Sequence, residues 1–100
     1  MSALDDIAAE RRRQIEVEGW SPAHDDAHHS GDLSKAASLY AWAAIRPDND
    51  RRYRGPGFAP PSWPWSAQWW KPGSPRRMLV KAAALIVAEI ERLDRIGGVA

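Results

Sequence analysis

The chain has no cysteine, so its 100 residues can form neither a disulfide framework nor a thiolate metal site or nucleophile. It also has almost no net charge, +1 at pH 7, and this excludes a global basic field for holding a nucleic-acid backbone. No hydrophobic run reaches the roughly 20 residues that span a bilayer, and acidic residues interrupt the only stretch that resembles a signal peptide. We therefore expect one soluble, cytoplasmic domain over residues 1–100, without a membrane or nucleic-acid partner.

The motifs of common catalytic sites are missing as well. The sequence contains no Gly-x-Ser-x-Gly elbow, no glycine-rich phosphate loop and no evident pairing of a nucleophile with a base. Glu91 and Asp94 resemble one magnesium-binding helix of the all-α nucleotide pyrophosphohydrolases, but those enzymes need a second acidic helix. Because arginines dilute Glu10 and Glu16, that second helix is absent and the pair is interpreted as solvated surface. We expect no enzyme and no cofactor.

Three stretches of helical periodicity predict an all-α fold with helices over about residues 4–18, 33–45 and 75–96. Ser2 is a suitable cap for the first helix and Gly19 a suitable stop. The predicted apolar stripe of this helix consists of Leu4, Ile7, Ala8 and Ile15. Its predicted solvated face consists of Glu10, Arg12, Arg13 and Glu16. Arg11 lies beside the apolar stripe, either as a snorkelling side chain or as an arginine aimed into a site.

The later helices carry clear start signals. Asp32 is the predicted N-cap of the second helix, and Ser74-Pro75 places a cap and a proline at the start of the third. The predicted apolar stripe of the third helix consists of Leu79, Ala82, Ala83, Ile86, Ile90 and Leu93. Val80 and Val87 extend the apolar surface beyond this stripe. Because the helix is apolar on more than one side, we expect a homo-oligomer.

Residues 46–73 hold six of the eight prolines and four of the six tryptophans. A loop this long inside a compact domain is usually functional or disordered, and disordered segments are poor in aromatic residues. We therefore expect an ordered, irregular Trp/Pro-rich excursion between the second and third helices. Trp63 and Trp65, which lie among prolines, are predicted to anchor it to the helices. For Trp69 and Trp70, core packing and a ligand site both remain open.

Three histidines and two aspartates lie between residues 24 and 29. Their spacing does not match a helical pair of metal ligands, and HD-type phosphohydrolases need further histidines on separate helices, so we assign no metal. In one interpretation Asp25 or Asp26 caps a turn, while His24 or Trp20 packs against the neighbouring helix. In the other, His24, Asp25 and Asp26 form a polar wall of a ligand site.

A basic and aromatic group surrounds the start of the third helix: Trp69, Trp70, Lys71, Arg76, Arg77 and Lys81. Arg76 and Arg77 lie in its first turn, where backbone amides favour an anion and where cations oppose the helix dipole. The tryptophans offer surfaces on which a base can stack, worth about 1–3 kcal/mol per base. Stacking combined with phosphate binding is the chemistry of nucleotide recognition. The alternative is that the tryptophans are core residues and the arginines are solvated.

Nearly the whole chain resembles a family of small uncharacterised bacteriophage and prophage proteins. The resemblance rests on residues 9–15, on Glu18-Gly19-Trp20 with the following His24-Asp25-Asp26, and on the Trp-Pro-Trp, Trp-Trp-Lys-Pro and Arg-Arg-x-Leu-Val-Lys-Ala motifs at residues 63–65, 69–72 and 76–82. It implies a viral origin and, in itself, no activity.

The chain is also distantly similar to the ryanodine-receptor (RyR) repeat domain. The similarity lies in an arginine-bearing helix, then Glu18-Gly19-Trp20, then Asp25-Asp26, then a closing helix rich in Arg, Ala and Lys. The long Trp/Pro segment is an addition to that pattern, and Met78 replaces its usual asparagine. The resemblance implies a nucleotide-derived ligand.

These observations lead to one functional expectation and one alternative. The first is a phage accessory protein that binds a nucleotide-like anionic small molecule without catalysis, and that could sequester a host immune signalling nucleotide. Its predicted site has Trp20, Trp69 or Trp70 on the base, the cations Lys71, Arg76, Arg77 and Lys81 near phosphate, and His24, Asp25 and Asp26 on polar edges. The alternative is a protein–protein interaction module, or an inhibitor of a host enzyme, that uses the Trp/Pro-rich surface.

Overall fold

The computed structural model describes residues 2–19, 31–45 and 59–97. Most of these residues lie in three α-helices: α1 (Ala3–Glu16), α3 (Asp32–Ala44) and α4 (Pro75–Arg95). A 3₁₀ turn, η1 (Ala67–Trp69), precedes α4, and the described ranges contain no strand. The predicted all-α fold is confirmed. Both ends of each predicted helix lie within about two residues of the observed ends.

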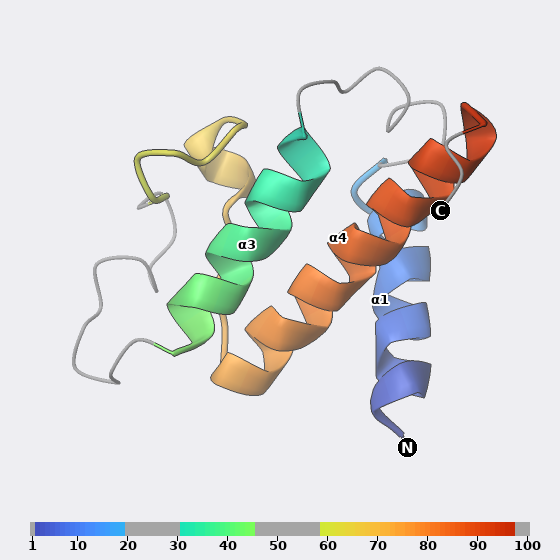
Figure 1. The fold of residues 1–100 in the computed structure, drawn as a ribbon. Coiled ribbons are helices and arrows are strands. Elements are labelled where there is room, and N and C mark those ends of the chain that lie inside the picture. Colours follow the sequence, from blue (N-terminus) through green and yellow to red (C-terminus); the bar gives the residue numbers. More distant parts are fainter. Residues whose placement is uncertain (1, 20–30, 46–58, 98–100) are drawn as a thin grey trace.

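The three helices lie side by side with α4 in the middle (Figure 1). α4 contacts α3 extensively and α1 to a smaller degree. α3 runs antiparallel to α4, whereas α1 runs in the same general direction as α4 (Figure 1). The described part of the Trp/Pro-rich excursion, residues 59–73, passes along α3 and leads into the start of α4 (Figure 1). None of the helices in the described part of the chain has the length and apolarity needed to cross a membrane.

The helix starts follow the predicted signals with one exception. Ser2 caps α1 in a reciprocal capping box with Asp5, and the Ser74 hydroxyl accepts the Arg77 backbone N–H at the start of α4. The predicted cap at Asp32 is wrong: the N-cap of α3 is Gly31, and Asp32 is the first helical residue. Gly31 has a φ of 74°, a left-handed conformation that glycine adopts at little cost.

The buried face of α1 is the polar face and not the predicted apolar one. Glu10, Arg11 and Gln14 are its buried residues, whereas Leu4 is 77% exposed. The prediction of a solvated Glu10 is wrong because α1 packs against its neighbours through ion pairs. Arg11 was interpreted either as a snorkelling side chain or as an arginine aimed into a site, and neither interpretation describes it fully. It is buried, and its Nε donates to the Glu91 carboxylate of α4 at 3.3 Å.

The contact between α3 and α4 is made largely by small side chains. α3 buries four alanines together with Leu33 and Tyr40. The buried residues of α4 are Met78, Val80, Lys81, Ala82, Ala84, Leu85 and Ala88. Alanines on both helices let the helix axes approach closely. The larger members of the predicted α4 stripe are therefore left on its exposed side, and Leu79, Ile86 and Ile90 are each about half exposed.

Candidate functional site

The site is held in place by an aromatic cluster that joins the Trp/Pro segment to α3. The ring of Trp70 stacks on Tyr40 with centroids 4.6 Å apart, and Trp63 meets both rings edge to face. Trp65 in turn packs edge to face on Trp63 at 5.3 Å. The predicted anchoring by Trp63 and Trp65 is thus present, and Trp70 joins them.

The η1 turn sends its two neighbouring tryptophans in different directions. Trp70 is 1% exposed and lies in the core, while Trp69 is only partly buried. Immediately after them, the Lys71 backbone N–H donates to the Tyr40 hydroxyl at 3.0 Å. The Lys71 ammonium lies 5.4 Å from the centre of the Trp69 ring, within the range of a cation–π contact. Trp69 and Lys71 therefore share a partly open surface.

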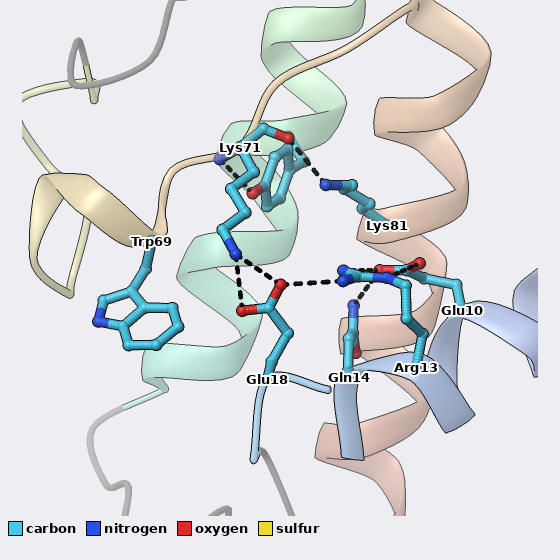
Figure 2. Close-up of a pocket in the computed structure, with 8 residues that line it drawn as sticks. Glu10, Arg13, Gln14, Glu18, Trp69, Lys71 and Lys81 are labelled. Carbon is cyan, nitrogen blue, oxygen red and sulfur yellow. Dashed lines mark hydrogen bonds and ion pairs between the residues drawn. The ribbon is translucent and has the colours of Figure 1, made fainter. Parts of the chain in front are cut away.

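A buried carboxylate is the centre of the polar cluster beside this surface (Figure 2). Glu10 accepts hydrogen bonds from Arg13 Nε at 2.8 Å, from Arg13 Nη2 at 2.9 Å and from Gln14 Nε2 at 3.1 Å. The Arg77 guanidinium, in the first turn of α4, also donates to Glu10. The Glu10 side chain is fully buried, so four donated hydrogen bonds compensate its lost hydration.

Glu18 extends the cluster toward the tryptophan (Figure 2). Its carboxylate accepts from Arg13 Nη1 at 2.9 Å and from Lys71 Nζ at 2.8 Å. Lys81 lies beside Lys71, and its ammonium donates to the Lys71 carbonyl oxygen at 2.8 Å (Figure 2). Burial lowers the pKa of Lys81 to about 8. The cluster thus ties α1, the Trp/Pro segment and α4 together.

Two cavities adjoin the cluster. The inner one has a volume of about 10 Å³, room for about one water molecule, and is lined by Glu10, Arg13, Gln14, Glu18, Tyr40, Trp69, Lys71 and Lys81. The outer one has a volume of about 210 Å³, is open to solvent and is lined by Asp6, Ala9, Glu10, Arg13, Arg76, Arg77 and Val80. Because Glu10 and Arg13 line both cavities, the two are neighbours.

Cations outnumber carboxylates around the cavities. The cations are Arg13, Lys71, Arg76, Arg77 and Lys81, and the carboxylates are Asp6, Glu10 and Glu18. In the outer cavity, Arg76 donates to Asp6 at 2.7 Å and keeps 64% of its side chain exposed. A guanidinium has five N–H donors in a planar fork that matches carboxylate and phosphate oxygens. The outer cavity is therefore suited to an anion.

Two carboxylates of the cluster, Glu10 and Glu18, have pKa values below their ordinary range. Burial alone would raise the pKa of Glu10, but hydrogen bonds and charges from Arg13 and Arg77 outweigh it and leave that pKa below 4.5. For Glu18, burial is likewise outweighed by Lys71 and Arg13, and the pKa is again lowered. Both groups are therefore ionised near neutral pH and make the cluster an ionic network.

These lowered pKa values predict acid-sensitive stability. The folded state binds fewer protons than the unfolded state, so the stabilisation is fully present above the ordinary pKa of 4.5 and is lost as the pH falls through the folded values of Glu10 and Glu18. Urea unfolding at a series of pH values from about 7 to about 3 should show the free energy of unfolding falling most steeply below pH 4.5. In Glu10→Gln the fall should be shallower. An identical slope in the variant would contradict the assigned network.

The structure brings together part of the predicted site. Lys71, Arg77 and Lys81 lie in one cluster with Trp69, and Arg76 lies at the outer cavity. Trp70 is a core residue. The predicted residues Trp20, His24, Asp25 and Asp26 lie outside the described residues.

Sequence reasoning missed the acidic half of the site. Asp6, Glu10, Gln14 and Glu18 recur at a spacing of four residues, which places them near one face of α1 and its end. That polar stripe was the available signal, but a polar helix face ordinarily faces solvent.

No protein-family model, curated protein or solved structure matches the chain.

Proposed function

We propose that this protein binds an anionic small molecule with nucleotide-like groups and does not turn it over. The observation that supports this most directly is the set of three arginines around the open outer cavity of about 210 Å³. Arg76 and Arg77 come from the first turn of α4 and Arg13 comes from α1, so the donors converge from two helices. Such convergence favours binding of phosphate or carboxylate oxygens.

The two carboxylates that line the outer cavity, Asp6 and Glu10, leave hydrogen-bond donors available to an anionic ligand. Glu10 is fully buried, and Asp6 is bound to Arg76 alone among the described side chains. Around the two neighbouring cavities together, five cations face three carboxylates, so positive charge remains in excess. Arg76 keeps 64% of its side chain exposed, so its outer donors are open to a charge-assisted hydrogen bond with an anion beside the partly buried Asp6 carboxylate.

Trp69 is the aromatic surface on which a base would stack. It is partly exposed, and Lys71 lies against its ring. Trp69 lines the inner cavity, and Arg13 lines both the inner and the outer cavity. Trp70 takes no part in the proposed site, since its ring is enclosed by the core. For a phage protein of the kind that the sequence resembles, such binding would serve to sequester a host signalling nucleotide.

Titration calorimetry with a panel of mononucleotides, cyclic nucleotides and ADP-ribose derivatives tests the proposal. We expect at least one of these compounds to bind, with an affinity that falls as salt is added because the contacts are ionic. If no member of the panel releases or absorbs heat, and inorganic phosphate does not compete with a fluorescent analogue, the proposal fails.

Removal of Arg76 should weaken this binding specifically. Charged hydrogen bonds contribute about 1.5–3 kcal/mol, so Arg76→Gln should lower the affinity by about tenfold or more. Arg12→Gln is the matched control, because Arg12 is an exposed arginine of α1 that lines neither cavity. Calorimetry on both variants measures the difference. Equal losses in the two would show that only net charge matters.

The alternative of a Trp/Pro interaction surface has less support. Trp63 and Trp70 belong to the core cluster, so such a surface would have to rely on the partly buried Trp65 and Trp69. Hot-spot residues are accessible before binding and buried afterwards, and two of the four tryptophans do not meet the first condition.

A further inference from the structure

The exposed side of α4 carries a continuous apolar stripe. Leu79, Ile86 and Ile90 are exposed by 50%, 49% and 52%, and Leu93 by 39%. With the half-buried Ala83 they are spaced by four, three, four and three residues. This is the spacing of the core positions of a coiled coil, at which one helix packs along another. The stripe is therefore patterned for a partner helix and not for a small ligand.

A hollow continues the apolar surface toward α1. It has a volume of about 320 Å³ and is lined by Leu4, Ile7, Ala8, Arg11, Val87 and Glu91. Val87 lies one turn from both Ala83 and Ile90, which connects the hollow to the stripe. The hollow can accept large side chains that project from an opposing helix.

A second copy of the chain offers an aliphatic surface that matches this stripe. Its own α4 exposes the same leucines and isoleucines at the same spacing, so two such stripes are self-complementary. Residues 20–30 and 46–58, which lie outside the described ranges, contain no leucine, isoleucine, valine or methionine.

The charges at the two ends of the stripe are opposite. Arg76 lies just before it and Asp94 just after it, and they are 18 residues apart. Because 18 residues make about five turns of an α-helix, both side chains lie on the same edge of α4. A second α4 in antiparallel orientation brings opposite charges together at both ends. A parallel orientation instead places the two Arg76 residues at one end and the two Asp94 residues at the other, so neither meets an opposite charge.

We propose that the α4 stripe pairs antiparallel with the same stripe of a second copy of the chain. The two-fold arrangement makes one apolar surface serve both subunits, and it places Arg76 near Asp94 of the partner subunit at each end. Arg76 keeps its contact with Asp6, since the guanidinium has further donors. The apolar stripe itself lines neither cavity beside Glu10, and Arg76 is the one residue that the pairing shares with the proposed anion site.

Sedimentation velocity on the full chain, from about 1 μM to about 1 mM, tests the pairing. We expect a dimer whose dissociation constant rises at least about 100-fold in Ile86→Glu, since a carboxylate would be buried at the centre of the interface. Ile45→Glu is the matched control: Ile45 is 79% exposed but lies at the end of α3, so this variant should remain dimeric. A wild-type monomer over the whole range, or a dimer unaffected by Ile86→Glu, overturns the proposal. Circular dichroism confirms that both variants are helical.

Distances between spin labels test the orientation. Because the chain has no cysteine, a single introduced cysteine is the only labelled position in each subunit. A label on Ile96→Cys lies at the C-terminal end of α4, beyond the stripe. In the antiparallel dimer the two labels are separated along the helix axis by about 30 Å, whereas in a parallel dimer they are neighbours. A short distance between the labels would overturn the antiparallel arrangement even if the dimer exists.

Discussion

Replacement of Trp70 by alanine should remove about 3–5 kcal/mol from the free energy of unfolding, the typical cost of deleting a buried aromatic side chain. Trp70 is 1% exposed, stacks on Tyr40 at 4.6 Å and meets Trp63 at 5.0 Å. Its ring lies between Tyr40 of α3 and Trp63, so its removal leaves both without their packing partner. Small domains have a total free energy of unfolding of about 5–15 kcal/mol, so the variant should lose a large part of its stability.

Trp69→Ala is the matched control for this loss. It removes the same side chain from the adjacent position, where the ring is only partly buried and contacts Lys71. We expect a cost of about 1 kcal/mol or less. Urea unfolding followed by circular dichroism measures both changes. Equal losses at the two positions would mean that the distinction between a core Trp70 and a partly buried Trp69 is incorrect.

Replacement of Glu10 by alanine should have the second largest effect, a loss of about 2–3 kcal/mol. The substitution leaves Arg13, Gln14 and Arg77 without their shared acceptor. The loss is smaller than for an ion pair in a dry interior, because both arginines are partly exposed and can be hydrated. Removing a negative charge at the cavity should also strengthen the binding of anions to the remaining folded protein.

The control for Glu10 is a carboxylate on the other side of the same helix. Glu16 is exposed on α1, so Glu16→Ala should change the free energy of unfolding by less than about 0.5 kcal/mol. Thermal or urea unfolding of the two variants compares them directly. If Glu10→Ala is as mild as Glu16→Ala, the buried carboxylate does not organise the cluster.

The helices could be predicted from the sequence because their signals are local. Ser2, Ser74 and Pro75 act within one turn of the helix ends that they define, and the periodicity of each segment is visible without its partners. Gly31 was missed as a cap because the adjacent Asp32 has the more typical side chain for that position.

The orientation of the helices could not be predicted in the same way. A stripe of Leu4, Ile7 and Ala8 ordinarily faces the core, but α1 turns Glu10 and Gln14 inward instead. Arg13 and Gln14 donate to Glu10 from within α1, but the donor that ties Glu10 to α4 is Arg77, 67 residues along the chain, so the burial of this carboxylate is a tertiary property. On α4, similarly, the close approach of α3 selects small residues for the core side and leaves the isoleucines outside.

The order of the tryptophans in the sequence does not predict which of them are buried. Trp63 and Trp70 are core residues, whereas Trp65 and Trp69 are partly buried. The division at Trp69 and Trp70 coincides with the end of the η1 turn: Trp69 is its last residue, and Trp70 follows with an extended backbone. The basic residues beside them pair with carboxylates at Glu10 and Glu18, a pairing that only the fold reveals.

The most direct test of the proposed anion site is a two-dimensional NMR titration that observes the Nε–H groups of the arginines and the indole N–H groups of the tryptophans. With a nucleotide from the binding panel, we expect the signals of Arg13, Arg76, Arg77 and Trp69 to shift together, while those of the exposed Arg12 and the enclosed Trp70 stay in place. Unchanged arginine signals at saturating nucleotide, or shifts confined to residues away from both cavities, would contradict the account.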